Sequence, residues 1–288
     1  MPELPEVETT LRGIEPYLRG RRVTAITVRE PRLRWPVPGS LAREAAGQAV
    51  RGARRRAKYL LIDLERGSLI LHLGMSGSLR VLEAQTPVLA HDHVDIVLDS
   101  GLALRFNDPR RFGSLLWTSE DALSHPLLRR LAPEPLDAAF NGAYLERVTR
   151  RRKVHIKQLL MNSQVVVGVG NIYASEALFR ARIDPRTPAG RLDQRSLDRL
   201  ARSIKQVLAL AIRVGGTTLR DYVSAEGTPG YFRQKLYVYE RVGKACRVCR
   251  TPIRQITQAQ RSSYFCPYCQ KKSWPRKTRK NTKRRKRK

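Results

Sequence analysis

Long apolar runs, cysteines and acidic residues are all scarce in this chain of 288 residues. No apolar run approaches the ~20 residues that a membrane-spanning helix needs, and the N-terminus has no signal-peptide pattern. Cysteine occurs four times, all within residues 246–269. That clustering is typical of a metal site in a reducing compartment and argues against a disulfide framework. We therefore expect a soluble, cytoplasmic protein without disulfide staples.

The scarcity of acid gives the chain a strongly positive charge. Against 25 Asp and Glu stand 56 Lys and Arg, a formal charge of +31, and residues 271–288 hold 12 of the basic residues and no acid. The first 270 residues still carry +19, the +31 less these 12. A body this basic needs a polyanionic partner, and nucleic acid is the leading candidate. An anionic membrane surface fits less well, because the basic residues do not line one amphipathic helix.

The hydrophobic pattern divides the chain into two domains of ordinary size, each large enough for its own core. A helix is predicted over residues 5–18. Short runs rich in Val, Ile and Leu then predict β-strands over 22–28, 59–64, 68–73, 78–83, 93–98, 102–107 and 114–118. One helix followed by about seven strands indicates a β-sandwich or barrel-like domain to about residue 130. Residues 131–135 have the composition of a linker.

Helical periodicity begins near residue 142, with helices predicted over 155–162, 171–182 and 193–213. Before the second of these, the turn from Gly168 to Asn171 opens onto a helix N-terminus, where backbone amides can bind a phosphate. Most such turns simply join helices. The predicted fold is α+β. Its units are 1–131, 132–234, a small unit at 235–270 and a basic tail at 271–288, which is predicted to be disordered.

The cysteine spacing is the strongest local motif. Two C-x-x-C pairs separated by 16 residues match a four-thiolate zinc ribbon, and the predicted ligands are Cys246, Cys249, Cys266 and Cys269. No histidine or carboxylate accompanies them to suggest an open coordination position, so we expect one structural Zn²⁺. The loop between the pairs is basic and polar, as a β-hairpin presented to DNA would be. A ribbon that contacts nothing is the alternative.

Three basic clusters precede the ribbon, at residues 51–58, 110–111 and 150–157. Each is either a solvated face or a phosphate contact, and the charge of the body favours phosphate contact for at least two of them. The loop at 107–112 also pairs guanidinium groups with the ring of Phe112. That pairing suits a wedge that enters a base stack, while arginine fills the space of an extruded base.

The N-terminus offers a different chemistry. If Met1 is removed, Pro2 carries a free secondary amine with a pKa near ~8, which can attack a carbonyl carbon. Condensation with an aldehyde gives an iminium that acts as an electron sink. A proline at position 2 is weak evidence by itself. A general acid or base role is natural for the adjacent Glu3, whereas Glu6 is equally well explained by the helix dipole.

Several motifs together resemble one known family. They are Pro2–Glu8, Arg55–Leu60, His72–Gly77, His91–His93, Asn107–Gly113, Gly168–Ala174, Gly215–Thr218 and the zinc ribbon. Colinear over residues 1–270, they resemble bacterial formamidopyrimidine-DNA glycosylase, the base-excision family for 8-oxoguanine and ring-opened purines. The resemblance implies a β-sandwich, a helix–two-turn–helix domain and a zinc-ribbon hairpin, with DNA in the cleft between the two domains.

The resemblance also implies roles for individual residues. The catalytic residues would be Pro2 as nucleophile, Glu3 as proton donor, Lys58 for β-elimination and Arg261 on the ribbon. Contacts to the DNA backbone would fall on His91, Arg152, Lys157 and Asn171. The void left by the flipped base would be filled by Met75, Arg110 and Phe112. A loop near residues 217–226 would close over the lesion.

The implied activity is that of a monomeric, bifunctional glycosylase and AP lyase, acting on damaged double-stranded DNA at the nucleoid. It would excise oxidised purines and cut the strand by β,δ-elimination through a Schiff base at Pro2. The related endonuclease VIII branch, which prefers oxidised pyrimidines, is one alternative, although it typically has Gly where this chain has Leu4. A non-catalytic zinc-ribbon DNA-binding protein is the other. The basic tail departs from the family pattern, so the resemblance implies no role for it.

Overall fold

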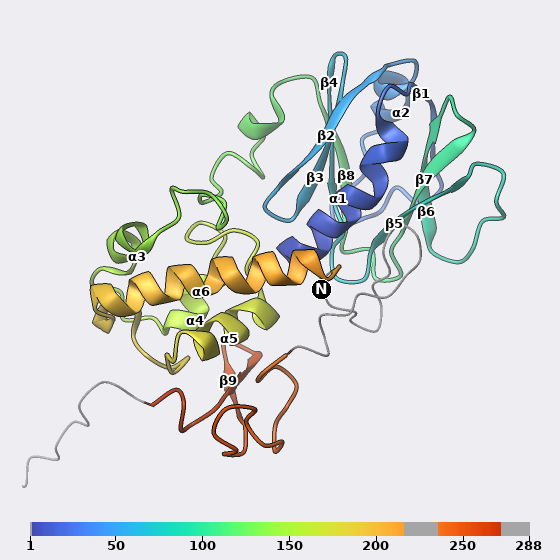
Figure 1. The fold of residues 1–288 in the computed structure, drawn as a ribbon. Coiled ribbons are helices and arrows are strands. Elements are labelled where there is room, and N and C mark those ends of the chain that lie inside the picture. Colours follow the sequence, from blue (N-terminus) through green and yellow to red (C-terminus); the bar gives the residue numbers. More distant parts are fainter. Residues whose placement is uncertain (1, 216–235, 272–288) are drawn as a thin grey trace, which may run out of the picture.

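Two four-stranded antiparallel sheets form the N-terminal domain of the computed structural model, which describes residues 2–215 and 236–271 (Figure 1). One sheet has the strand order β1 (Val23–Val28), β6 (Asp92–Leu98), β7 (Leu102–Asn107), β5 (Ser78–Glu83). The other has the order β2 (Val50–Arg56), β3 (Tyr59–Leu64), β4 (Gly67–His72), β8 (Ser114–Thr118). Apolar side chains from both sheets share one buried cluster. The predicted β-sandwich is therefore confirmed.

Helix α1 (Leu4–Leu18) contributes to the cores of both domains. Val7, Ile14 and Leu18 pack into the sandwich core, whereas Leu4 belongs to the core of the helical domain. The helix starts with a capping box between Glu3, its N-cap, and Glu6, which satisfies amides of the first turn. Its first turn therefore stands at the junction of the two domains (Figure 1).

The second domain is helical. Its helices are α3 (Gly142–Thr149), α4 (Ile156–Leu160), α5 (Asn171–Arg180) and α6 (Gln194–Arg213), with 3₁₀ turns at Ala122–Ser124 before it and Ala189–Arg191 within it. The three predicted helices are confirmed, with ends that differ by up to two residues. Helix α3 and the short α2 (Leu41–Ala45) of the first domain were not predicted. Helix α6 is capped by Asp193, whose side chain accepts a hydrogen bond from the Ser196 amide, and it buries Leu197, Leu200 and Ile204.

The zinc-ribbon unit carries the hairpin β9 (Arg254–Gln258) and β10 (Arg261–Phe265). Ala259 and Gln260 join the strands, and both have positive φ, as a tight two-residue hairpin turn requires. The hairpin packs against α5, so the ribbon belongs structurally to the helical domain. None of the helices in the described ranges combines the length and apolar character needed to cross a membrane.

Two predicted segments cannot be compared with the structure. The closing loop at 217–226 and residues 272–288 of the basic tail lie outside the described residues.

Candidate active site

The carboxylate of Glu3 lies between the first turns of two helices. Its Oε2 accepts a hydrogen bond from the Gly170 amide at 2.6 Å, and its Oε1 accepts one from the Ile172 amide at 2.9 Å. Glu3 is only 2% exposed. The residue that starts α1 therefore also caps α5, where the positive ends of both helix dipoles favour an anion. The turn at Gly168–Asn171 was a weak candidate for phosphate binding by its sequence, and in the structure the Gly170 and Ile172 amides donate to this carboxylate.

Two glycines make this approach possible. A Cβ on Gly170 would lie 2.4 Å from Cδ of Glu3, and a Cβ on Gly168 would lie 2.5 Å from Cβ of Leu4. Gly168 also has a φ of +74° and accepts the Leu4 amide through its carbonyl at 3.0 Å. The glycine turn is therefore shaped to receive the start of the chain.

Glu6 holds the backbone of this segment. Its Oε2 accepts the Glu3 amide at 2.9 Å, and its Oε1 accepts the Tyr173 hydroxyl at 2.6 Å. Tyr173 belongs to α5, so Glu6 also connects the two domains. The sequence left Glu6 undecided between a helix-dipole partner and a chemical role, and the structure gives it a positioning contact.

The buried Pro2 precedes Glu3. Lys58 lies within electrostatic reach of Glu3, and Arg261 lies within electrostatic reach of Lys58. Burial raises the pKa of Glu3, and the positive charge of Lys58 opposes that rise. Burial lowers the pKa of Lys58, Glu3 and Glu6 oppose the fall, and Arg261 reinforces it. Electrostatic interactions thus link three of the four predicted catalytic residues, Glu3 with Lys58 and Lys58 with Arg261, and Pro2 adjoins Glu3 in the chain. The raised pKa lets the Glu3 carboxyl keep its proton, and the lowered pKa lets the Lys58 amine lose one more easily. Both shifts suit general acid–base catalysis.

Lys157 joins the helical domain to the zinc hairpin. Its Nζ donates to Asn171 Oδ1 at 2.5 Å, to the Ser262 carbonyl at 2.8 Å and to Ser263 Oγ at 2.8 Å. Burial lowers its pKa to about 8, with Arg261 adding to the effect and Glu3 opposing it. A lysine has three donors, and all three are used within the protein. Lys157 therefore positions Asn171 and the hairpin.

A second group of predicted residues lies on two loops of the sandwich. Met75 and Phe112 are 38% and 43% exposed, and the Arg110 guanidinium lies 4.8 Å from the centroid of the Phe112 ring. Asp108, which the sequence analysis did not single out, is fully buried and accepts Ser76 Oγ at 2.8 Å and the Gly113 amide at 2.7 Å. This one carboxylate fixes both loops, so the exposed side chains project from a rigid base.

The remaining predicted DNA contacts are exposed. His91 has a φ of +69°, and its carbonyl accepts the Asp108 amide at 3.1 Å, which attaches it to the same group of loops. Arg152 lies on the surface between α3 and α4, remote in sequence from the wedge loops.

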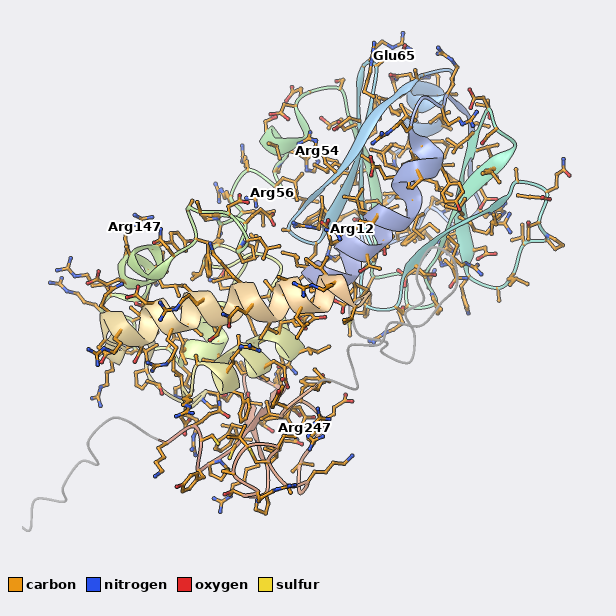
Figure 2. All side chains as sticks on the ribbon, in the orientation of Figure 1. Arg12, Arg54, Arg56, Glu65, Arg147 and Arg247 are labelled. Atoms are coloured by element: carbon orange, nitrogen blue, oxygen red, sulfur yellow. The ribbon has the colours of Figure 1, made fainter. Side chains whose placement is uncertain are left out.

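The basic cluster at 51–58 is largely neutralised inside the protein. Arg54 pairs with Asp63 at 2.6 Å, and Arg55 and Arg56 pair with Glu134 of the linker at 2.6 and 2.8 Å. Both labelled members of this cluster, Arg54 and Arg56, extend from β2 toward the segment that leads into the linker (Figure 2). Phosphate contact by these three arginines is therefore not supported, because Arg54 is paired within the sandwich and Arg55 and Arg56 are paired at the domain junction.

A cavity of about 200 Å³ opens between the domains beside Lys58. His72 lines it, and burial lowers the pKa of His72 to about 4, so the imidazole is neutral at physiological pH. Because its Nδ1 accepts the Gly74 amide at 3.0 Å, the proton resides on Nε2. The sequence analysis quoted His72 only as part of a motif. Its place next to Lys58 comes from the pairing of β3 with β4.

The four cysteines form a compact thiolate cluster. All four Sγ atoms lie within 4.8 Å of one another, with 3.4 Å between those of Cys249 and Cys266 and 4.0 Å between those of Cys246 and Cys269. A tetrahedral zinc with Zn–S bonds of ~2.3 Å places its sulfurs roughly 3.8 Å apart. The cluster therefore fits one structural Zn²⁺, which would fix the base of the hairpin that carries Arg261.

Comparison with known proteins agrees with this architecture along the chain. Residues 1–115 match the formamidopyrimidine-DNA glycosylase N-terminal domain, residues 131–223 match the H2TH domain of the same glycosylase, and residues 243–272 match a zinc finger found in FPG and IleRS. The formamidopyrimidine-DNA glycosylase of Thioalkalivibrio sulfidiphilus is 59% identical over 94% of this chain and 100% of its own length. That of Pseudomonas aeruginosa is 57% identical with the same coverage.

Solved structures show the same fold. The MutM (FPG) protein of Thermus thermophilus superposes with a TM-score of 0.84 at 38% identity, over 93% of this chain and 98% of the other. A Lactococcus lactis FPG variant in complex with Fapy-dG-containing DNA gives 0.88 at 34% identity, over 94% and 100%. Fold and site together define a zinc-ribbon DNA glycosylase. The chain belongs to the formamidopyrimidine-DNA glycosylase family, whose members combine base excision with AP lyase activity.

Proposed function

We propose that this protein excises oxidised purines, 8-oxoguanine and formamidopyrimidines, from duplex DNA and then cleaves the strand at the abasic site. The observation that carries the proposal is the buried Glu3 carboxyl, which follows Pro2 directly and lies within the electrostatic reach of Lys58. An acid, an amine nucleophile and a cation at one point are what glycosyl transfer to an enzyme nitrogen requires. We further propose that the enzyme acts as a monomer in the cytoplasm, in association with the nucleoid.

In the proposed reaction the Pro2 nitrogen, freed by removal of Met1, attacks C1′ of the damaged nucleotide. The C1′–N bond to the base breaks, and the base leaves with the proton that the Pro2 nitrogen releases. Glu3 then gives its own proton to the ring oxygen as the sugar opens. The resulting iminium between Pro2 and C1′ acidifies the 2′ hydrogen. Its loss expels the 3′ phosphate, and a second elimination expels the 5′ phosphate. Lys58 and Arg261 hold the flanking phosphates, and the lowered pKa of Lys58 suits it to accept a proton.

The exposed loops supply the proposed DNA grip. Met75, Arg110 and Phe112 would fill the space of the extruded nucleotide, because an apolar pair with a guanidinium over one ring can both stack and donate hydrogen bonds. His91, Arg152 and Asn171 would contact the DNA backbone, Asn171 with its side chain oriented by Lys157. The zinc would have a structural role only, and it would keep Arg261 at the hairpin tip in place.

The nucleophile is tested by borohydride trapping with the Pro2→Gly variant. Wild-type protein should form a covalent complex with an 8-oxoguanine:C duplex, and Pro2→Gly should lose it or trap far more slowly through its primary amine. Intact-mass measurement of both proteins verifies that Met1 is absent. Trapping of Pro2→Gly at the wild-type rate would remove Pro2 from the mechanism.

A parallel nicking assay tests the substrate class. One Lactococcus lactis FPG structure contains DNA with an oxidised pyrimidine, so a thymine glycol duplex is the informative competitor. We expect faster nicking of the 8-oxoguanine duplex. Preference for thymine glycol would support the endonuclease VIII alternative, and nicking of neither duplex would favour a non-catalytic DNA-binding protein.

A further inference from the structure

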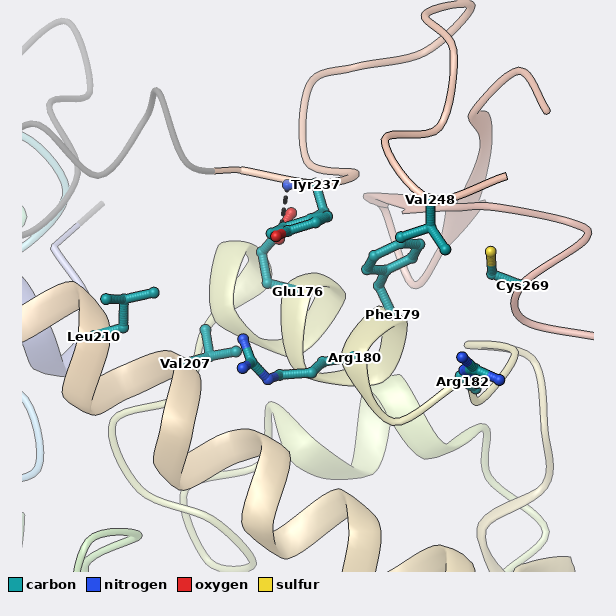
Figure 3. A pocket seen from close by; sticks show the side chains of 9 residues that line it. All are labelled: Glu176, Phe179, Arg180, Arg182, Val207, Leu210, Tyr237, Val248 and Cys269. Carbon is teal, nitrogen blue, oxygen red and sulfur yellow. Dashed lines mark hydrogen bonds between the residues drawn. The ribbon is translucent and has the colours of Figure 1, made fainter. Parts of the chain in front are cut away.

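A cavity of about 280 Å³ lies where α5, α6 and the first zinc knuckle meet (Figure 3). Its walls are apolar, and the residues that form them are Phe179, Val207, Leu210, Tyr237 and Val248. The rings of Phe179 and Tyr237 stack with centroids 5.4 Å apart. The volume is close to the lower limit of ~300 Å³ for ligand pockets, so the cavity suits one bulky side chain. None of the proposed catalytic residues lines it.

Positive charge surrounds this cavity. Arg180 and Arg182 line it and are exposed, and the Arg247 guanidinium lies 5.7 Å from the centroid of the Tyr237 ring. Arg180 Nε donates to Gln206 Oε1 at 3.0 Å, which orients its guanidinium. Within residues 2–215 and 236–271, neither Arg180 nor Arg182 forms an ion pair with a carboxylate. Their charge is available to an anionic ligand.

The acid among the lining residues does not cancel this charge at the entrance. Glu176 is 4% exposed, and its oxygens accept the amides of Tyr237, Val238 and Tyr239, each at 2.9 Å. Figure 3 shows the contact between Glu176 and Tyr237 as a dashed line. The oxygens of Glu176 are bound to the backbone, and within the described residues Glu176 forms no ion pair with Arg180 or Arg182.

We propose that this cavity is a docking site for an acidic peptide segment of a partner protein. One aromatic or bulky apolar side chain of the peptide enters the cavity, and neighbouring carboxylates pair with Arg180 and Arg182. Buried aromatic anchors flanked by arginine carry most of the binding energy in interfaces of this kind, and a guanidinium also binds an aromatic face. The planar fork of arginine matches a carboxylate.

Other occupants fit less well. The basic tail of this chain has 12 basic residues and no acid over 271–288, so it would bring like charge to the two arginines. A second copy of a chain with a formal charge of +31 is disfavoured for the same reason. The cavity involves the C-terminal end of α5, and a ten-residue helix is roughly 15 Å long. A peptide there leaves Asn171, at the start of α5, open to DNA.

The test is fluorescence anisotropy on the full, zinc-loaded chain with a labelled peptide of six aspartates followed by Leu-Phe. The double variant Arg180→Glu/Arg182→Glu should weaken peptide binding at least tenfold. Arg202→Glu is the matched control, since Arg202 is exposed on α6 outside this cavity, and it should change binding less than twofold. Replacing the terminal Phe of the peptide with Ser should weaken binding to the wild type at least tenfold.

Two further measurements separate the proposal from simpler explanations. Val248→Ser, at a residue 60% exposed, alters the apolar wall without changing charge and should weaken peptide binding several-fold at unchanged zinc content. All the variants should nick a damaged duplex at the wild-type rate. Equal losses in the Arg180/Arg182 double variant and Arg202→Glu would reduce the binding to bulk charge attraction and overturn the proposal. A tenfold loss of affinity for naked duplex in the double variant alone would make the surface a DNA contact and overturn it equally.

Discussion

Two buried glutamates connect α5 to the rest of the molecule, and they differ in what surrounds them. Glu3 accepts amides at the start of α5 and attaches the N-terminal domain. Glu176, within α5, accepts three successive amides and attaches the zinc ribbon. Glu3 is 2% exposed and Glu176 is 4% exposed, and burial raises the pKa of both carboxyls. By burial and hydrogen bonding alone, the two would be equivalent.

The neighbours separate them. The largest effect opposing the raised pKa of Glu3 is the charge of Lys58, and an N-terminal amine nucleophile is proposed one residue away. The raised pKa of Glu176 is opposed mainly by backbone amides, with the charge of Arg247 last. A buried carboxyl with a raised pKa is therefore not by itself a sign of catalysis. What marks Glu3 is the reactive group and the titratable amine beside it.

The sharpest test of this comparison replaces each glutamate with glutamine. Glu3→Gln keeps an acceptor oxygen for the α5 amides but has no proton to donate, so excision of 8-oxoguanine should fall by ~10²–10⁴-fold. Single-turnover kinetics measure the loss, and binding to uncleaved damaged duplex should change little.

Glu176→Gln serves as the matched control. Excision should stay within about tenfold of wild type, while the free energy of unfolding falls by about 1–3 kcal/mol, because one of the three ribbon amides faces a donor. Equal loss of excision in the two variants, at equal folded fraction, would show that Glu3 acts only as a structural link.

Much of the fold was predictable because the spacing of apolar residues along each segment indicates a helix or a strand. Helix α6 and seven of the eight sandwich strands have such patterns. Strand β2 does not, since Arg54, Arg55 and Arg56 occupy three of its seven positions. Those arginines are stable in a strand because Asp63, Glu8 and Glu134 neutralise them. Two of these partners lie 47 and 79 residues away, and no local pattern encodes such pairs.

Sequence motifs named the members of the candidate site, whereas the contacts between them come only from the structure. The cysteine spacing predicted the zinc ribbon, and the family resemblance indicated Pro2, Glu3 and Lys58. The contact of Glu3 with Gly170 spans 167 residues, and it places a carboxylate at a turn whose sequence was compatible with phosphate binding. Lys157 likewise reaches Ser263, 106 residues away. These contacts depend on how two domains dock, which neither spacing nor periodicity reveals.

The pH dependence of stability gives a second, smaller test. A carboxyl whose pKa is higher in the folded state than its ordinary 4.5 binds more protons when folded. Wild-type stability should therefore fall as pH rises from about 4.5 through the raised pKa of Glu3. Glu3→Gln lacks this contribution, so its unfolding free energy relative to wild type should increase over that range in urea titrations.

Lys58→Met tests a pH dependence of the opposite sign. The pKa of Lys58 is lowered, so wild-type stability gains from this residue as pH rises toward 10.5.

The cations beside the two glutamates extend the comparison, and the smallest effect of all is expected at Arg247. Lys58→Ala should lower strand cleavage by ~10²-fold or more if its amine takes part in proton transfer. Arg247 is to Glu176 what Lys58 is to Glu3, a cation whose charge lowers the pKa of the carboxyl. Arg247→Ala should nevertheless change cleavage less than twofold, because Arg247 is exposed and its charge contributes least to the pKa of Glu176. Cleavage of a preformed abasic site isolates the lyase step and avoids any effect on base recognition. Arg247→Ala could instead lose nearly as much cleavage activity as Lys58→Ala. The two cations would then act through the attraction of a +31 protein for its DNA, and not through the carboxyl that each one faces.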